Sequence, residues 1–320
     1  MPSPTSLSPA GETAAVEICG LTMTYGDKVA VDDLSLSIER HRITAVLGPN
    51  GAGKTTTLET CEGYRRSQRG TVRVLGLDPV RDRRDLLPRI GVMLQAGGAW
   101  SGVRAMEMLR HIASLHAHPL DTGMLSERLG LAECGKTPYR RLSGGQQQRL
   151  GLAMAVVGRP ELAFVDEPTA GMDPAARRTT WALMEELRDD GVTVVLTTHY
   201  LEEAERLADR VHIIDHGRLI ASGSPLELTR GGRHATIRLV VTEPFPPQAP
   251  ESLRGELGAD TEVTAVDEYS LLISGPADST TLATVSRWCE QQGVLPESLN
   301  LGQRTLEDVF LELTGRELTP

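Results

Sequence analysis

A glycine-rich loop between an apolar run and a helical pattern constrains this chain more than any other feature of its sequence. Residues Ile43 to Leu47 are apolar or β-branched, which predicts a buried strand. They lead into Gly48-Pro49-Asn50-Gly51-Ala52-Gly53-Lys54-Thr55, and a helix is expected from about Lys54. A strand, a loop and a helix in this order are the setting in which Gly-x-x-x-x-Gly-Lys-Thr binds phosphate groups.

The chemistry of this loop suits a nucleotide. Glycines let the backbone wrap closely, so that N–H groups point at phosphate oxygens, and the next helix presents its positive end to the same anions. Lys54 adds a charge at the β- and γ-phosphates, while Thr55, followed by Thr56, supplies a hydroxyl for Mg²⁺. Chance would produce only roughly 0.01 such matches in a chain of this length. We therefore expect ATP and Mg²⁺ to bind along residues 48–56.

Two acids follow another apolar run. Leu162 to Val165 predict a buried strand that ends at Asp166 and Glu167. Ligands of doubly wound sheets gather at the carboxyl ends of strands, so Asp166 is expected to reach the Mg²⁺. Glu167 would lie beside the γ-phosphate and polarise the attacking water. Alone this pattern is a weak signal, but a phosphate loop requires a metal-holding acid on a neighbouring strand.

A second glycine-rich helix start occurs at Leu142-Ser143-Gly144-Gly145-Gln146. A serine and two glycines at a helix N-terminus form another anion site. With the first loop, this pentapeptide resembles the signature motif of the nucleotide-binding subunits of ABC transporters, and the resemblance covers roughly residues 16–230.

Further motifs stand in the order of that family. Gln95 falls at the Q-loop glutamine, and Ala170-Gly171-Met172-Asp173 resembles the D-loop, with Asp173 as its acid. His199 matches the switch histidine, and Tyr25 lies where an aromatic ring stacks on adenine. Taken singly, each residue has an ordinary structural explanation; their order and spacing give them weight.

The resemblance implies a mechanism and partners. Two subunits, most simply a homodimer, meet head to tail with ATP between the phosphate loop of one and the signature helix of the other. Glu167 is the expected general base, with His199 and Lys54 at the γ-phosphate. Thr55, Gln95 and Asp166 are the expected residues around Mg²⁺, and Gln95 links this site to a separate polytopic membrane permease.

The patterns along the chain predict an α/β fold of the P-loop NTPase type. Strands with a turn at Tyr25-Gly26-Asp27 are expected over Val16 to Ile38, and a largely helical region over Arg81 to Arg141. Helical spacing over Pro174 to Arg188 followed by the apolar run Val192 to Thr198 indicates a βαβ unit. Together with these patterns, the resemblance implies a nucleotide-binding domain over residues 16–230, with a parallel sheet core, an antiparallel β subdomain and a helical subdomain at about 96–160.

The two ends of the chain differ from the predicted nucleotide-binding domain in composition and pattern. Residues 1–15 are expected to be a disordered lead-in, because they are rich in Pro, Ser and Ala. Arg230-Gly231-Gly232-Arg233 is the expected linker to an α+β accessory domain at 234–320, with strand His234 to Thr242, a loop at Pro244 to Pro250, and β-α-β-β-α-β order. That order suggests a ferredoxin-like fold.

The last helix carries a finer resemblance. Residues 305–315 resemble the C-terminal end of daunorubicin-resistance-type exporter ATPases, which implies drug or antibiotic efflux. Thr305 is expected to cap this helix, with Asp308 three residues on. An apolar face is expected to follow from Leu306, Val309, Phe310 and Leu313.

Charge and hydropathy narrow the alternatives. The net charge of −10 disfavours nucleic-acid binding, which requires a basic surface. No apolar run approaches about 18 residues, and the N-terminus lacks the features of a secretory signal. For such a chain the resemblance implies a peripheral protein at the cytoplasmic side of the membrane. An ABC importer ATPase, a soluble ABC ATPase acting on ribosomes or DNA, and a nucleotide-binding regulator without turnover remain as alternatives.

Overall fold

The computed structural model describes residues 14–93, 100–230, 236–258, 261–275, 279–302 and 304–315. The chain divides into two compact units, Met1–Ser222 and Gly223–Pro320. Gln95 and residues 231–233 of the expected linker lie outside the described residues. So does the expected lead-in, apart from its last two residues, Ala14 and Ala15, which begin the first strand.

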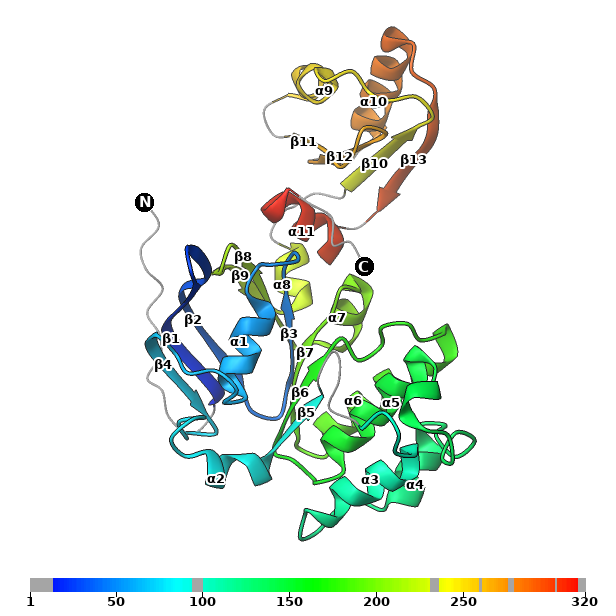
Figure 1. Ribbon diagram of the computed structural model, residues 1–320. Helices are drawn as coiled ribbons and strands as arrows, with labels where there is room; N and C mark the ends of the chain where they lie inside the picture. The colour runs from blue at the N-terminus through cyan, green and yellow to red at the C-terminus, as the bar shows by residue number, and fades with distance from the viewer. Residues whose placement is uncertain are drawn as a thin grey trace. The chain divides into compact units, whose positions relative to one another are not determined.

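The first unit is built on a six-stranded sheet in the order β5-β6-β7-β3-β8-β9 (Figure 1). Strands β5, β6, β7, β3 and β8 pair in parallel. Their residues are almost all buried, which explains their continuous apolar runs. The bounds are β3 (Ile43–Leu47), β5 (Ile90–Met93), β6 (Leu162–Asp166), β7 (Thr193–Thr197), β8 (Arg210–Asp215) and β9 (Arg218–Gly223).

A three-stranded antiparallel sheet packs beside this sheet, in the order β2-β1-β4. Its strands are β1 (Ala14–Tyr25), β2 (Lys28–Glu39) and β4 (Arg69–Val74), and a turn at Gly26-Asp27 joins the first two. One apolar cluster joins these strands to helix α1 (Lys54–Cys61) and to the parallel sheet. It is made mainly of Val, Leu and Ile, as the scarcity of aromatic residues requires.

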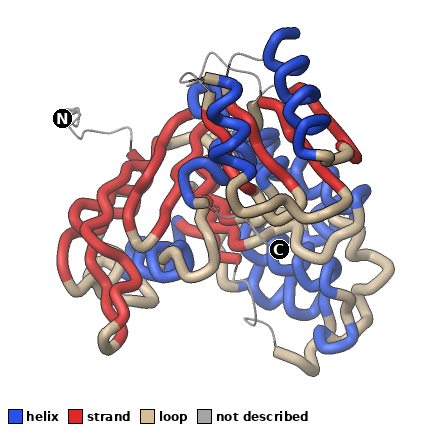
Figure 2. Tube along the Cα trace, turned by 90° about the horizontal axis from the view of Figure 1, so that it is seen from above, coloured by secondary structure: helices blue, strands red, loops and turns tan. Residues whose placement is uncertain are grey.

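Helices cover the other face of the parallel sheet. Helix α5 (Gly144–Val156) contacts β5 and β6, and α6 (Pro174–Asp189) contacts β7 and β3. Figures 1 and 2 show the antiparallel strands at one side of this unit and the helical region at the other. The remaining elements of the unit are α2 (Arg83–Leu86), η1 (Leu87–Arg89), α3 (Ala105–Ser114), α4 (Thr122–Arg128), η2 (Tyr139–Arg141) and α7 (Leu201–Leu207).

Strand β5 corrects the expectation that Arg81 to Arg141 has few strand signals. It forms the edge of the parallel sheet, next to β6. Its four residues include Gly91, where a Cβ atom would lie 2.0 Å from the Ala155 carbonyl oxygen. Close packing against α5 therefore requires a glycine inside the strand, and this glycine weakened the sequence signal.

The second unit contains a four-stranded antiparallel sheet in the order β11-β12-β10-β13. Two helices connect these strands, and the element order is β-α-β-β-α-β, so the ferredoxin-like prediction is confirmed. Its core clusters around Trp288. The elements are α8 (Pro225–Arg230), β10 (Thr236–Val241), α9 (Ala249–Leu257), β11 (Glu262–Ala265), β12 (Ser270–Ser274), α10 (Ser279–Gln292), β13 (Pro296–Gly302) and α11 (Leu306–Thr314).

Two details of this unit differ from expectation. Helix α9 begins at Ala249, inside the stretch Pro244 to Pro250 that was expected to be a loop, because proline is well tolerated in the first turn of a helix. The capping box of Thr305 and Asp308 is confirmed in α11. On the apolar face of that helix, however, Leu313 is 45% exposed, and Leu311 is buried instead.

Candidate active site

The loop Gly48–Thr55 joins β3 to α1, and three of its positions require glycine. Gly51 and Gly53 have φ values of +81° and +104°, a region that side chains with a Cβ atom rarely adopt. A Cβ atom on Gly53 would lie 2.4 Å from the Ala30 carbonyl oxygen, and one on Gly48 would lie 2.2 Å from that of Ile214. The loop is therefore held against β2 and β8 through its glycines.

Lys54 is the first residue of α1 and is only 8% exposed. Its Nζ donates to the carbonyl oxygens of Gly48, at 2.5 Å, and Pro49, at 3.2 Å. Burial lowers the pKa of this ammonium group, while the charges of Glu167 and Asp166 act in the opposite direction. A negatively charged ligand at this loop would stabilise the charged form of Lys54 and so offset the cost of its burial.

A cavity of about 230 Å³ opens in front of this loop. It brings together most of the residues singled out from the sequence. Its lining residues are Tyr25, Lys28, Ala30, Asn50, Gly51, Ala52, Gly53, Lys54, Thr55, Thr56, Asp166, Glu167 and His199.

Asp166 ends β6, beside the phosphate loop. The Thr197 hydroxyl on neighbouring β7 contacts Asp166 Oδ1. Burial raises the pKa of this carboxyl group, although the hydrogen bond from Thr197 lowers it. A cation beside Asp166 would relieve the cost of burying its negative charge.

Glu167 and His199 contact each other at one wall of the cavity. Glu167 has a positive φ of +50°, and its N–H donates to the Thr197 carbonyl oxygen at 3.1 Å. This backbone turn directs the carboxylate to His199, whose Nε2 contacts Glu167 Oε1. Both side chains are largely buried, and His199 Nδ1 has no hydrogen-bond partner among the described residues. The pair therefore combines a carboxylate base with an imidazole at one wall of the cavity.

The donor set at this cavity fits Mg²⁺. The Thr55 hydroxyl and the Asp166 carboxylate line the same space, and oxygen is the ligand atom that Mg²⁺ prefers. No group of three or more His, Cys, Asp or Glu side chains among the described residues could hold a metal. A site with few protein ligands suits this ion, which usually keeps waters and phosphate oxygens as its remaining ligands.

The Ser143–Gln146 motif starts α5 and is not among the residues that line this cavity. Ser143 and Gln146 form a reciprocal capping box, and the position of Gly144 is open, with no atom within 4 Å of an ideal Cβ. A Cβ on Gly145 would lie 3.4 Å from the Gly171 carbonyl oxygen. The signature and the D-loop segment are thus neighbours, with Asp173 capping α6 through the N–H groups of Ala175 and Ala176.

Three site residues were not predicted. Lys28 and Ala30 line the cavity, and Thr197 contacts Asp166. The sequence did offer a signal for Lys28, because it is one of only three lysines in a chain that otherwise uses arginine. Tyr25, which was predicted, lies at the cavity with 42% of its surface exposed and with the Arg65 guanidinium 5.2 Å from its ring centroid.

Comparisons with known proteins agree with this geometry. Residues 31–170 match the family model described as ABC transporter. A daunorubicin resistance ATP-binding protein, DrrA3 of Streptomyces coeruleorubidus, is 36% identical over 94% of this chain and 96% of its own length. The Nod factor export ATP-binding protein I of Sinorhizobium fredii is 37% identical over 98% of this chain and 90% of its own.

Solved structures share the fold. An ATP-binding subunit of an ABC transporter aligns with a TM-score of 0.63 at 24% identity, over 68% of this chain and 92% of that one. A dimeric ATP-binding cassette in a post-hydrolysis state, bound to ADP and Pi, aligns with a TM-score of 0.60 at 22% identity, over 65% of this chain and 98% of that one.

Proposed function

Since this chain belongs to the family of ABC transporter ATP-binding subunits and is an ATP hydrolase, we propose that it is the motor subunit of an exporter that acts through a separate membrane permease. The observation that carries this proposal is the cavity that gathers Lys54, Asp166, Glu167 and His199. Relatives named for daunorubicin resistance and Nod factor export support an exporter over an importer. The proposed process is efflux, and the proposed cargo is a drug or an antibiotic.

Roles can be proposed for the residues singled out from the sequence. The glycine-rich loop and Lys54 bind the phosphates, Tyr25 stacks on adenine, and Thr55, Asp166 and Gln95 hold Mg²⁺. When bound, this ion supplies charge neutralisation at the β- and γ-phosphates. Glu167 accepts a proton from the attacking water, and His199 holds Glu167 in place and contacts the γ-phosphate.

The exposed signature motif supports a shared site. Ser143 is exposed, and Gly144 has open space around it, although neither lines the cavity of its own chain. A helix start with free N–H groups suits a phosphate that a second subunit presents. We propose a homodimer in which Ser143 to Gln146 of one chain close the ATP site of the other, with Asp173 nearby.

Glu167→Gln tests the assignment of the base. The amide keeps the size of the side chain but cannot take a proton, so turnover should fall by about 10²- to 10⁴-fold. ATP binding, measured by equilibrium dialysis with Mg²⁺, should remain. Glu202→Gln, which neutralises an exposed carboxylate on α7, is the matched control. Undiminished hydrolysis by the Glu167 variant would refute the assignment.

The shared site predicts a concentration dependence. Activity should rise more steeply than linearly with protein concentration while dimers form, because each site needs a second chain. Specific activity that stays constant through the range in which sedimentation shows dimer formation would contradict the proposal.

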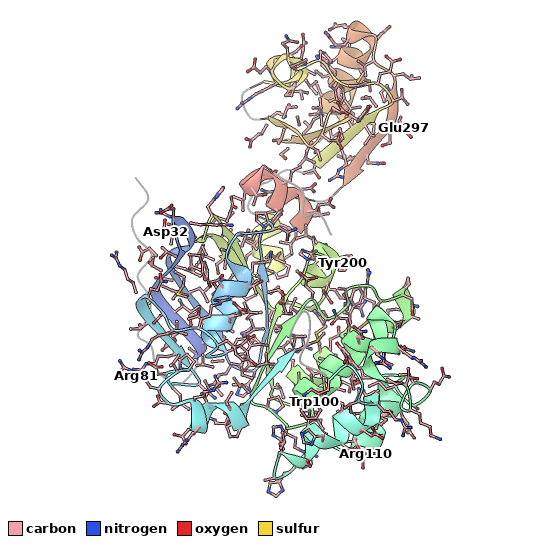
Figure 3. All side chains as sticks on the ribbon, viewed as in Figure 1. Asp32, Arg81, Trp100, Arg110, Tyr200 and Glu297 are labelled. Atoms are coloured by element: carbon pink, nitrogen blue, oxygen red, sulfur yellow. The ribbon has the colours of Figure 1, made fainter. Side chains whose placement is uncertain are left out.

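The membrane partner can be tested separately. None of the described helices is long and apolar enough to cross a bilayer. The proposed attachment at the cytoplasmic side of the membrane is through the permease. We propose that the permease docks on the helical region that contains α3, where Trp100, marked in Figure 3, is 60% exposed. The chain should co-purify with a polytopic membrane protein, whereas recovery only with ribosomes or nucleoid would favour a different class of ABC ATPase.

A further inference from the structure

Glu203 is a fully buried carboxylate outside the cavity. It is the third residue of α7, the helix that follows His199, and its exposure is 0%. Burying a carboxylate costs free energy unless fixed donors surround it. A leucine would pack at such a position without this cost, so the donors around Glu203 need an explanation.

Three segments meet at this carboxylate. The Trp181 indole Nε1 on α6 donates to Glu203 Oε1 at 2.9 Å. Burial raises the pKa of Glu203, while the Thr198, Trp181 and Thr169 side chains lower it through hydrogen bonding. Thr198 immediately precedes His199, and Thr169 stands two residues after Glu167. The carboxylate therefore adjoins the segments that carry both members of the proposed catalytic pair.

The threonines are held in place around it. Thr169 and Thr198 are 0% and 1% exposed. Thr198 Oγ1 accepts a hydrogen bond from the Tyr200 N–H at 2.9 Å, so the hydroxyl proton of Thr198 remains available for another acceptor. Glu203 Oε2 and Thr169 Oγ1 are both buried without a partner of good hydrogen-bond geometry among the described residues.

The surrounding side chains connect the same group to the D-loop. Helix α6, which carries Trp181, is capped by Asp173. Arg177, one turn after that cap, places its guanidinium 4.3 Å from the ring centroid of Tyr200, which Figure 3 marks at the start of α7. Movement of the D-loop helix would therefore be transmitted to α7 through Trp181, Arg177 and Glu203.

We propose that Glu203 is a positioning residue for ATP hydrolysis. By accepting the Trp181 hydrogen bond and by packing beside the buried threonines Thr198 and Thr169, it fixes the placement of Glu167 relative to His199. It also ties that pair to α6, so that closure of the site by a second chain aligns the pair. This inference rests on the roles proposed above for Glu167 and His199.

The central experiment changes the donor and the acceptor of the hydrogen bond between Trp181 and Glu203 separately. Trp181→Phe deletes the indole N–H but keeps a ring, and Glu203→Gln keeps one acceptor oxygen while removing the second. Trp288→Phe is the matched control, because Trp288 is also buried and its indole donates to Ser252 Oγ at 3.1 Å in the other unit. For each full-length variant we would measure Tm, the Kd for ATP, and kcat at saturating Mg²⁺ and ATP.

Misplacement of catalytic groups lowers the rate more than the affinity. We expect Trp181→Phe and Glu203→Gln to lower kcat by about tenfold or more, with ATP binding changed less than about twofold. Trp288→Phe should lower Tm without changing kcat. Equal kcat values for Trp181→Phe and Trp288→Phe in folded protein would overturn the inference.

A double-mutant cycle separates positioning from general weakening. If Glu203 acts through His199, then Glu203→Gln should cost about tenfold in the parent but little in a His199→Ala background. An equal loss in both backgrounds would overturn the positioning role. Should His199→Ala and Glu167→Gln both retain full turnover, the proposed function of the pair would fail instead, which keeps the two failures distinct.

Discussion

Glu62 provides a stability prediction that can be worked through from the structure. It follows α1, is 5% exposed, and lies close enough to Asp166 and Glu59 to feel their charges. Burial, followed by these two carboxylates, raises the pKa of Glu62 from 4.5 to about 8. Replacing Glu62 with glutamine keeps the shape of the protonated side chain and removes its titration.

The sign and size follow from proton linkage. Below pH 4.5 the carboxyl is protonated in both states, so it does not affect stability. Between pH 4.5 and about 8 the unfolded chain ionises while the folded chain stays protonated, so stability falls as the pH rises. At about 1.4 kcal/mol for each pKa unit, the complete loss above pH 8 is at most about 5 kcal/mol.

Thermal unfolding of Glu62→Gln and the parent protein, followed over pH 4 to 9 in EDTA, checks this prediction. EDTA is needed because a divalent cation beside Asp166 would also attract Glu62. The two proteins should have similar Tm values near pH 4, and the variant should have the higher Tm at pH 9, by about 10 °C at most. Glu202→Gln should follow the parent at every pH. A Tm difference that does not change with pH would refute the reasoning.

Three further predictions concern other parts of the chain. Gly53→Ala should weaken ATP binding by about 5- to 30-fold in calorimetry, because a Cβ at φ +104° costs about 1–2 kcal/mol. Gly76→Ala, at φ +81° with no atom near its Cβ position, should leave binding unchanged. Burial lowers the pKa of His212 from 6.5 to about 4, so between these pH values the unfolded chain takes up a proton that the folded chain does not. The stability that neutral His212 provides should therefore be complete above pH 6.5 and lost as the pH falls through 4. The Tm of His212→Gln should lack this pH dependence. Thr305→Ala removes the cap that accepts from the Asp308 N–H and should cost about 1 kcal/mol in denaturant melts of the second unit.

The parts of the fold that could be read from sequence are those in which local pattern and burial agree. The run Ile43–Leu47 is a strand with the predicted bounds, and the capping box at Thr305 was legible because its partners are three residues apart. Strand β5 was missed because Gly91 serves a contact with Ala155, which is remote in sequence. Only the tertiary structure reveals that requirement.

The same limit applies to the site. Motif spacing located the phosphate loop and the acids, the family resemblance located His199, and the cavity gathers them. Spacing did not reveal that Thr197 contacts Asp166 or that Trp181 donates to Glu203, because these pairs depend on how neighbouring strands and helices align. Threonine and tryptophan at such positions look like ordinary core residues in the sequence.

The hydrogen bonds of Lys54 to its own loop have a calorimetric consequence. The Lys54 ammonium group donates hydrogen bonds to the carbonyl oxygens of Gly48 and Pro49, and burial lowers the pKa of this group. An arriving triphosphate would stabilise the charged form of Lys54 and so raise that pKa. In alkaline buffer, ATP association should therefore be accompanied by proton uptake. The apparent binding enthalpy would then vary with the ionisation enthalpy of the buffer, and titrations in two buffers at one pH would count the protons.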